Sequence, residues 1–211
     1  MVATRAVTAG TLMAGAIALA ACSSVSGTAT APESTEAAPG SVRPTLTDPK
    51  VQPPDQDNKY TRSTARPHVV FDPCTWMMPD DITAIGYADR SRERGTDLVA
   101  EYTFLSCRFQ ANDYTTSLRI NSGNVTWDED QQKNGNWLQA TEVNGRQAAR
   151  GQDPGGVQGG AGTCEIHMRT KVGVVFITQA VKTLGEQRGV DPCTNLDHIA
   201  SVVEKSIGKE N

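Results

Sequence analysis

FDPCT, residues 71–75, contains the tetrapeptide DPCT, and the chain repeats this tetrapeptide at residues 191–194. In each copy an aspartate stands before a proline and a cysteine follows the proline. Aspartate is a preferred helix N-cap, and proline suits the first helical position because the N–H that it lacks would have no intrahelical partner there. We therefore expect each copy to begin a helix, with Cys74 or Cys193 in the first turn.

Two further cysteines lie in segments that resemble strands. Cys107 belongs to residues 105–109, where apolar and polar residues alternate, and Cys164 belongs to the apolar run 164–168. Four cysteines allow three pairings. The most economical pairing joins each helix start to the nearest strand, so we predict the disulfides Cys74–Cys107 and Cys164–Cys193.

Zinc binding and thiol redox chemistry are the rival roles for these four cysteines. The sequence has no CxxC pair, successive cysteines lie about thirty residues apart or more, and no histidines stand at ligand spacing. We therefore predict structural disulfides of an oxidising compartment, with no metal and no cofactor.

The rest of the pattern predicts an α+β fold, in which an antiparallel β-sheet packs against N- and C-terminal helices. We expect helical pieces at 73–77 and 79–85, strands at 105–109, 118–120, 164–168 and 174–180, and a tight hairpin at 143–146, where Asn144 and Gly145 tolerate positive φ. The last helix shows one apolar face before Gly208 ends it. This face consists of Cys193, Leu196, Ala200, Val203 and Ile207.

The N-terminus has the features of a bacterial lipoprotein signal. Arg5 provides the charged start, residues 6–19 are apolar, and Leu-Ala-Ala-Cys at residues 19–22 is a lipobox. At ~1.5 Å per residue the apolar run spans about 21 Å, which is short of the ~30 Å hydrocarbon core of a membrane. We therefore predict a signal peptide at residues 1–21 and lipidation of Cys22, whose acyl chains would hold the protein on the extracytoplasmic face of the plasma membrane.

Composition divides the mature chain into two parts. Residues 23–67 hold seven of the eleven prolines, and Tyr60 is their only aromatic residue. Such a segment buries too little apolar surface to offset its ordering entropy, so residues 22–67 are predicted to form a lipidated, disordered tether. Residues 68–211 contain all three tryptophans, all three histidines and the four other cysteines. They are predicted to form one disulfide-stabilised globular domain.

Charge argues against nucleic acid as a partner. Removal of residues 1–21 leaves 19 Lys and Arg against 24 Asp and Glu, a net charge of −5. A surface of this kind has no basic stripe to neutralise phosphates. Arg90, Arg92 and Arg94 form a local exception, but Asp89 and Glu93 alternate with them, and we interpret the segment as a solvated loop.

Several of these features together resemble the actinobacterial lipoproteins of the LprB and LprC type, which carry a domain of unknown function. They are the lipobox, the tether, the cysteine-bearing segments 71–74, 107–109, 164–166 and 191–193, and the turn 143–145. The resemblance covers residues 71–207. One departure is Phe109, where that family usually has tryptophan. The resemblance implies an envelope protein with two disulfides, and it transfers no catalytic residue to this chain.

Signatures of catalysis or of ion binding are weak in this sequence. The GxSxG, HExxH and SxxK motifs are missing, and no Gly-Lys-Ser/Thr follows the glycine-rich segment 151–162. Acidic residues 128–130 lack the glycine and the closing glutamate of a calcium loop, so we expect a solvated helix start near Trp127. His167 on a strand and His198 on the last helix are each interpreted as structural or surface residues.

Three functions remain open from the sequence. The first is a non-enzymatic binding or accessory module of the cell envelope, with Trp127 or Trp137 on its binding surface and an envelope protein or glycolipid as partner. The alternative is a lipid or glycolipid carrier, which needs an apolar cavity between sheet and helix. An unrecognised hydrolase is the third, and it requires His167 or His198 within hydrogen-bond reach of a hydroxyl and a carboxylate.

Overall fold

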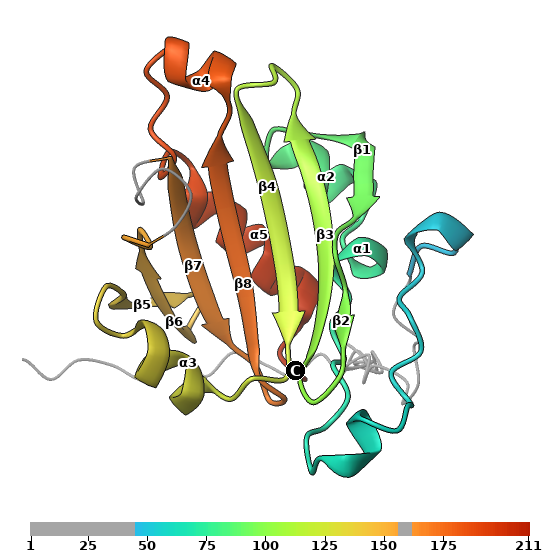
Figure 1. Ribbon diagram of the computed structural model, residues 1–211. Coiled ribbons are helices and arrows are strands. Elements are labelled where there is room, and N and C mark those ends of the chain that lie inside the picture. Colours follow the sequence, from blue (N-terminus) through green and yellow to red (C-terminus); the bar gives the residue numbers. More distant parts are fainter. Residues whose placement is uncertain (1–44, 156–161) are drawn as a thin grey trace, which may run out of the picture. The chain divides into compact units, whose positions relative to one another are not determined.

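An eight-stranded antiparallel sheet forms the centre of the computed structural model, which describes residues 45–155 and 162–211 (Figure 1). The strand order is β1-β3-β4-β8-β7-β6-β5, and the short β2 pairs with β3 beyond the end of β1. The strands are β1 Tyr87–Arg94, β2 Leu98–Val99, β3 Thr103–Ala111, β4 Thr116–Gly123, β5 Gln139–Val143, β6 Arg146–Gly151, β7 Thr163–Arg169 and β8 Val174–Val181.

Helices from both ends of the domain cover one face of this sheet, and the predicted α+β fold is confirmed. Figure 1 shows α1, α2 and the long α5 behind the strands, while α3 stands beside β6 and β7. The helices are α1 Pro73–Trp76, α2 Pro79–Ala84, α3 Trp127–Asn134, α4 Thr183–Gln187 and α5 Leu196–Ile207, with two 3-10 turns, η1 Pro49–Val51 and η2 Thr61–Ser63.

The covered face of the sheet is the hydrophobic core. Strand alternation places Cys107, Ile120, Ile177 and Ile166 in one row across β3, β4, β8 and β7, and all four are fully buried. The apolar face predicted for α5 packs on this sheet within a single buried cluster. The opposite face of the sheet, which α1, α2 and α5 do not cover, is called the open face below.

Both predicted disulfides are confirmed. Cys74 in α1 is bonded to Cys107 in β3, and Cys164 in β7 is bonded to Cys193 just before α5. One bond joins α1 to β3, the other joins the turn before α5 to β7, and each pair of Cα atoms is 5.1 Å apart. The two disulfides indicate an extracytoplasmic location for the domain.

The two copies of DPCT differ in the structure. Asp72 caps α1 as predicted, and its side chain accepts a hydrogen bond from the Cys74 N–H. The prediction for the second copy is wrong, because Asp191 accepts from the Cys193 N–H within a turn and α5 begins only at Leu196. Asn195, with φ of 64°, separates this turn from the helix.

The predicted hairpin is confirmed between β5 and β6. Val143 pairs with Arg146, and the two residues between them, Asn144 and Gly145, have φ values of 51° and 81°. Both lie in the left-handed region, which asparagine and glycine tolerate better than other residues. Gly208, with φ of 80°, ends α5 as predicted.

The described part of the predicted tether, residues 45–67, is folded against the domain rather than disordered. Val51 lies in the core cluster, and its carbonyl oxygen accepts a hydrogen bond from Arg94 at 2.8 Å. The Leu46 N–H donates to the carbonyl of Thr75, and the Asn58 side chain donates to that of Val99. Backbone carbonyls and polar side chains thus compensate for the scarcity of apolar residues in this segment.

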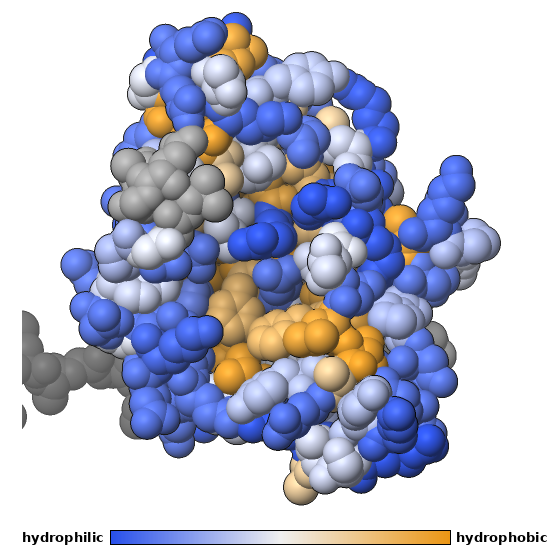
Figure 2. Space-filling view, viewed as in Figure 1, coloured by the Kyte–Doolittle hydropathy of each residue, from blue (hydrophilic) through white to orange (hydrophobic). Residues whose placement is uncertain are grey.

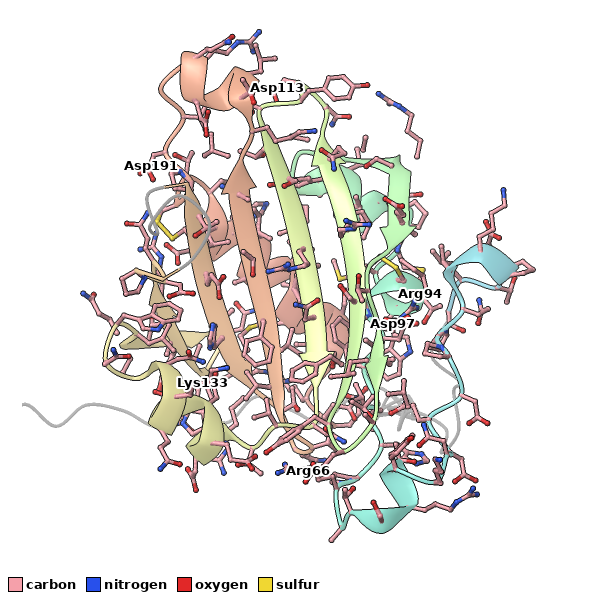
Figure 3. The ribbon with its side chains drawn as sticks, viewed as in Figure 1. Arg66, Arg94, Asp97, Asp113, Lys133 and Asp191 are labelled. Atoms are coloured by element: carbon pink, nitrogen blue, oxygen red, sulfur yellow. A yellow bond between two sulfur atoms is a disulfide. The ribbon has the colours of Figure 1, made fainter. Side chains whose placement is uncertain are left out.

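The segment interpreted as a solvated loop is strand β1, and two of its three arginines are largely buried. The guanidinium of Arg92 contacts Asp89 and the carbonyls of Cys74 and Met77. Arg94 contacts Asp72 and Asp97, and Figure 3 shows Arg94 and Asp97 together at the β1 edge of the sheet. The acidic and basic residues that alternate in this segment thus belong to a strand, on which Arg92 and Arg94 form ion pairs and are not solvated.

Some predictions lie outside the described residues. They concern the signal peptide at residues 1–21, lipidated Cys22, the tether up to residue 44 and residues 156–161 of the glycine-rich segment. Within residues 45–155 and 162–211, no helix has the length and hydropathy needed to cross a membrane.

Candidate functional site

The open face combines aromatic rings with charged side chains. Strand alternation places Asn121, Phe176 and His167 in one row across β4, β8 and β7, and Arg119, Thr178 and Glu165 in the next row. Figure 2 shows apolar side chains in a hollow of this face, surrounded by hydrophilic residues. A sheet face inside a folded core would not carry so many ionisable groups, so this face is the outer surface of the sheet.

A cavity of about 270 Å³ opens on this face beside α3, and we call it the Trp137 pocket. Its aromatic lining residues are Phe104, Trp137 and Phe176. Its ionisable lining residues are Arg119, Glu129, Asp130, Lys133, Asp153, Glu165 and His167. Figure 3 shows Lys133 on α3, at the side of the open face.

Two glycines make room for the aromatic rings of the pocket. A Cβ atom on Gly151 of β6 would lie 2.9 Å from a ring carbon of Trp137. A Cβ atom on Gly123 of β4 would lie 2.5 Å from the ring of Phe104, its cross-strand neighbour. Both distances are too short for real carbon atoms, so a larger residue at either position would push its ring out of place.

Local sequence signals position α3 at the rim of the pocket. Thr126 and Glu129 form a reciprocal capping box, in which each side chain accepts from the backbone N–H of the other residue. Glu129 also receives two hydrogen bonds from Arg66, whose guanidinium lies over the ring of Tyr102 at 3.9 Å. The Arg66 hydrogen bonds, with those from Thr126, lower the pKa of Glu129 well below its ordinary range.

His167 forms the floor of the pocket between two carboxylates. Its Nδ1 lies 2.9 Å from Oδ2 of Asp130, and its Nε2 lies 3.1 Å from Oε2 of Glu165. The imidazole meets the edges of two rings, with its centroid 4.7 Å from that of Phe176 and 5.6 Å from that of Trp137. Only 1 % of His167 and 2 % of Asp130 are exposed, so the geometry of the floor is fixed.

The two carboxylates favour the imidazolium form of His167. Burial alone would lower its pKa, but the hydrogen bonds to Asp130 and Glu165 outweigh burial, and the pKa is raised above its ordinary value. For Asp130, burial opposes ionisation, yet the bonds from His167 and Asn134 lower its pKa. An ionised carboxylate only accepts hydrogen bonds, so each ring nitrogen carries a proton when both bonds are made.

The raised pKa predicts how stability depends on pH. The contribution of protonated His167 is complete below its unfolded-state pKa of about 6.5 and is lost as the pH rises through the higher folded-state pKa. Between these two values, the free energy of unfolding should fall by up to about 1.4 kcal/mol per pH unit. Urea denaturation from pH 6 to pH 9 measures this slope, and the variant His167→Gln should lose it. Equal slopes for the two proteins would show that His167 is not an imidazolium in the fold.

The residues around His167 do not form the arrangement that a hydrolase needs. Within the described residues, its two ring nitrogens bond carboxylates and no hydroxyl lies within hydrogen-bond distance of either. No group of three or more metal-ligating side chains occurs there either. The two carboxylates thus hold the ring and the charge of His167 in place.

The structure separates the two tryptophans that the sequence offered as a binding surface. Trp137 lines the pocket, whereas Trp127 lies in a different hollow with Arg169 and Lys171. His198 is exposed on α5 and does not take part. Sequence reasoning missed Asp130, which was expected in a solvated helix start, and Glu165, although its spacing of two from His167 on a strand places both on one face.

Comparisons with known proteins give the family of this chain. No curated protein and no solved structure matches it. The family described as "Protein of unknown function (DUF3558)" matches residues 17–206, which is most of the chain. The chain therefore belongs to the DUF3558 family.

Proposed function

We propose that this protein is a lipid-anchored binding module of the cell envelope, whose ligand docks in the Trp137 pocket. The lipobox at residues 19–22 supports an anchor at Cys22, as in the LprB and LprC type of lipoprotein. The disulfides support a place outside the cytoplasm. The plasma membrane is then one partner, through the acyl chains, and the envelope supplies the ligand.

The prearranged floor of the pocket is the observation that carries this proposal. Trp137, Phe176 and His167 meet edge to face, and carboxylates hold His167 at both nitrogens. A site whose side chains are already fixed loses little side-chain entropy when a ligand binds. Mostly preformed hollows with aromatic walls and a few placed polar groups are typical of ligand sites.

The size and lining of the pocket favour a small polar molecule with a ring, such as a glycolipid headgroup. A volume of about 270 Å³ is close to the ~300 Å³ at the lower end of small-ligand pockets. Arg119 and Lys133 make no hydrogen bond or ion pair with any described residue, so their donors remain for a ligand. An envelope protein would instead need a wider apolar surface around Trp137.

The carrier function finds no support between sheet and helix. Acyl chains would need space there, but Ile120, Ile177, Ile199 and Val203 are each no more than 1 % exposed and belong to one packed cluster. A close-packed interior has few voids larger than a water molecule. We therefore place the ligand on the open face.

Purification with the native ligand tests the proposal. The full chain is isolated from its native envelope in a mild uncharged detergent, and bound molecules are identified by native mass spectrometry. Trp137→Ala should reduce ligand occupancy at least tenfold, because buried aromatic anchors carry much of the binding free energy. Trp127→Ala, which removes the same side chain outside the pocket, should retain the ligand.

Two outcomes would contradict the proposal. One is a ligand that survives Trp137→Ala, and the other is a ligand lost only with Trp127→Ala. Trp137→Phe serves as a folding control, since it keeps an aromatic ring over Gly151 and should bind with intermediate occupancy.

A further inference from the structure

Arg108 and Arg119 face each other across β3 and β4 on the open face. Like charges directly opposite on neighbouring strands destabilise a sheet unless something neutralises them. The nearest acid to Arg108 is Glu93, at 3.6 Å, and half or more of each of these two side chains is exposed. Arg119 has no ion pair with any residue of the described ranges. Of the two arginines, Arg119 is therefore left without a counterion among the described residues, and Arg108 has only an exposed one.

Both arginines line a second hollow of about 310 Å³, which we call the arginine hollow. Among the described residues it has no acidic lining residue. The arginine hollow and the Trp137 pocket share Arg119 and Thr178, so the two are adjacent on the open face. On β1, Glu93 lies opposite Arg108 and is largely exposed, and in the Trp137 pocket Glu165 is engaged by His167. Of the two adjacent hollows, the arginine hollow is thus the one whose lining favours an anion, because the Trp137 pocket has acidic lining residues.

A buried hydroxyl in the arginine hollow also lacks a partner. Thr163 is 8 % exposed and lines the hollow from β7, and its Oγ1 has no hydrogen-bond partner among the residues described. Its strand position, two residues before Glu165, places it on the open face. Buried hydroxyls nearly always find a partner in native proteins, so this oxygen indicates a missing bond donor or acceptor.

We propose that the arginine hollow binds a phosphate group. Phosphate oxygens accept paired hydrogen bonds from planar guanidinium groups, which Arg108 and Arg119 supply from opposite strands. Thr163 Oγ1 donates a further hydrogen bond and thereby gains its missing partner. This inference rests on the proposed function and specifies its ligand, with the phosphate in the arginine hollow and the ring in the Trp137 pocket.

Inorganic phosphate and a phosphorylated lipid headgroup share this chemistry, and two probes distinguish them. The full chain, in micelles of an uncharged detergent, is titrated by calorimetry with inorganic phosphate and with monomeric dihexanoyl-phosphatidylinositol. Tighter binding of the lipid, with the gain lost in Trp137→Ala, identifies a headgroup as ligand. Equal or tighter binding of inorganic phosphate identifies the free ion. Both results support the site.

Three variants test the residues of the site. Arg108→Gln and Arg119→Gln should each weaken phosphate binding about tenfold or more, because each removes a charge-assisted bond. Thr163→Val keeps the shape of the side chain and the net charge, and should weaken binding severalfold. The matched control is Arg90→Gln, which removes the same charge from an exposed position on β1 and should leave the affinity unchanged.

Three results would overturn the inference. They are the absence of phosphate binding, equal weakening by Arg90→Gln, and full affinity in all three site variants. None of them bears on whether Trp137→Ala loses the native ligand. Failure of the phosphate site is thus distinguishable from failure of the proposed function.

Discussion

Replacing Arg94 with glutamine is expected to lower the free energy of unfolding by about 3 to 5 kcal/mol, because the change leaves buried carboxylates without a counterion. Nη1 of Arg94 lies 2.9 and 3.0 Å from the two carboxylate oxygens of Asp72, and its Nε lies 2.8 Å from Asp97. The side chains of Asp72 and Asp97 are 5 % and 14 % exposed. Chemical denaturation of the full chain measures the loss.

The same guanidinium joins three parts of the fold. Asp72 caps α1, Asp97 accepts from the Ser106 N–H of β3, and the carbonyl of Val51 belongs to the N-terminal segment. Loss of Arg94 should therefore also expose residues 45–67 to proteolysis.

Arg90→Gln is the control for this prediction, because Arg90 lies on the same strand with an exposed side chain. Its expected effect is within about 0.5 kcal/mol. If the two variants were equally stable, the Arg94 network would be a surface feature with little energetic value.

The second large effect concerns the disulfides. Replacing Cys74 and Cys107 together with alanine should lower the free energy of unfolding by about 3 to 4 kcal/mol, since the bond closes a loop with a sequence separation of 33. Cys164 and Cys193 are separated by 29 residues, so removing that pair should have the same effect to within about 0.1 kcal/mol if chain entropy alone acts. Denaturation of the two double variants provides the comparison.

Alkylation without reductant tests the pairing itself. The intact native chain should gain no alkyl group on these four cysteines, and each double variant should likewise gain none. Uptake of four groups by the native chain would refute both bonds, and uptake by a double variant would indicate a different connectivity.

The sequence predicted those elements that are determined by residues close to them in the chain. Asp72 before Pro73 caps α1, Asn144 and Gly145 turn the hairpin, and Gly208 ends α5, because each residue acts on backbone atoms a few positions away. The disulfide pairing was also predictable, since Cys107 and Cys164 lie on strands with a clear pattern and Cys74 and Cys193 lie in the repeated DPCT segments. The alternation of apolar and polar residues along the strands also predicted which side chains face the helices.

Features that depend on distant partners were not predictable in the same way. Arg92 and Arg94 look like surface residues until α1 and the N-terminal segment supply their acceptors. Residues 45–67 have few apolar residues, and hydrogen bonds such as that from Asn58 to Val99 hold them against the domain. The second DPCT fails as a helix start because Asn195 takes a left-handed conformation before α5.

The candidate site likewise combines residues that the sequence could identify with residues that only the fold brings together. The sequence offered Trp137 as a candidate because a tryptophan in a polar segment stands out, and the structure places it in the lining of the Trp137 pocket. Asp130 was not predictable, since nothing near it in the sequence shows that α3 turns it toward His167, 37 positions away. The arginine pair required the register of β3 on β4, which the alternation of each strand leaves open.

Fluorine NMR of the full chain labelled with 5-fluorotryptophan most directly tests whether the Trp137 pocket is the binding site. The chain has three tryptophans, and only Trp137 lines the pocket, since Trp127 lies in another hollow and Trp76 packs against Phe71. On addition of an envelope extract from the native host, the Trp137 resonance should shift while the other two stay in place. A shift of Trp127 or Trp76 with Trp137 unchanged, or no shift at all, would contradict the assignment of the open face as the binding surface.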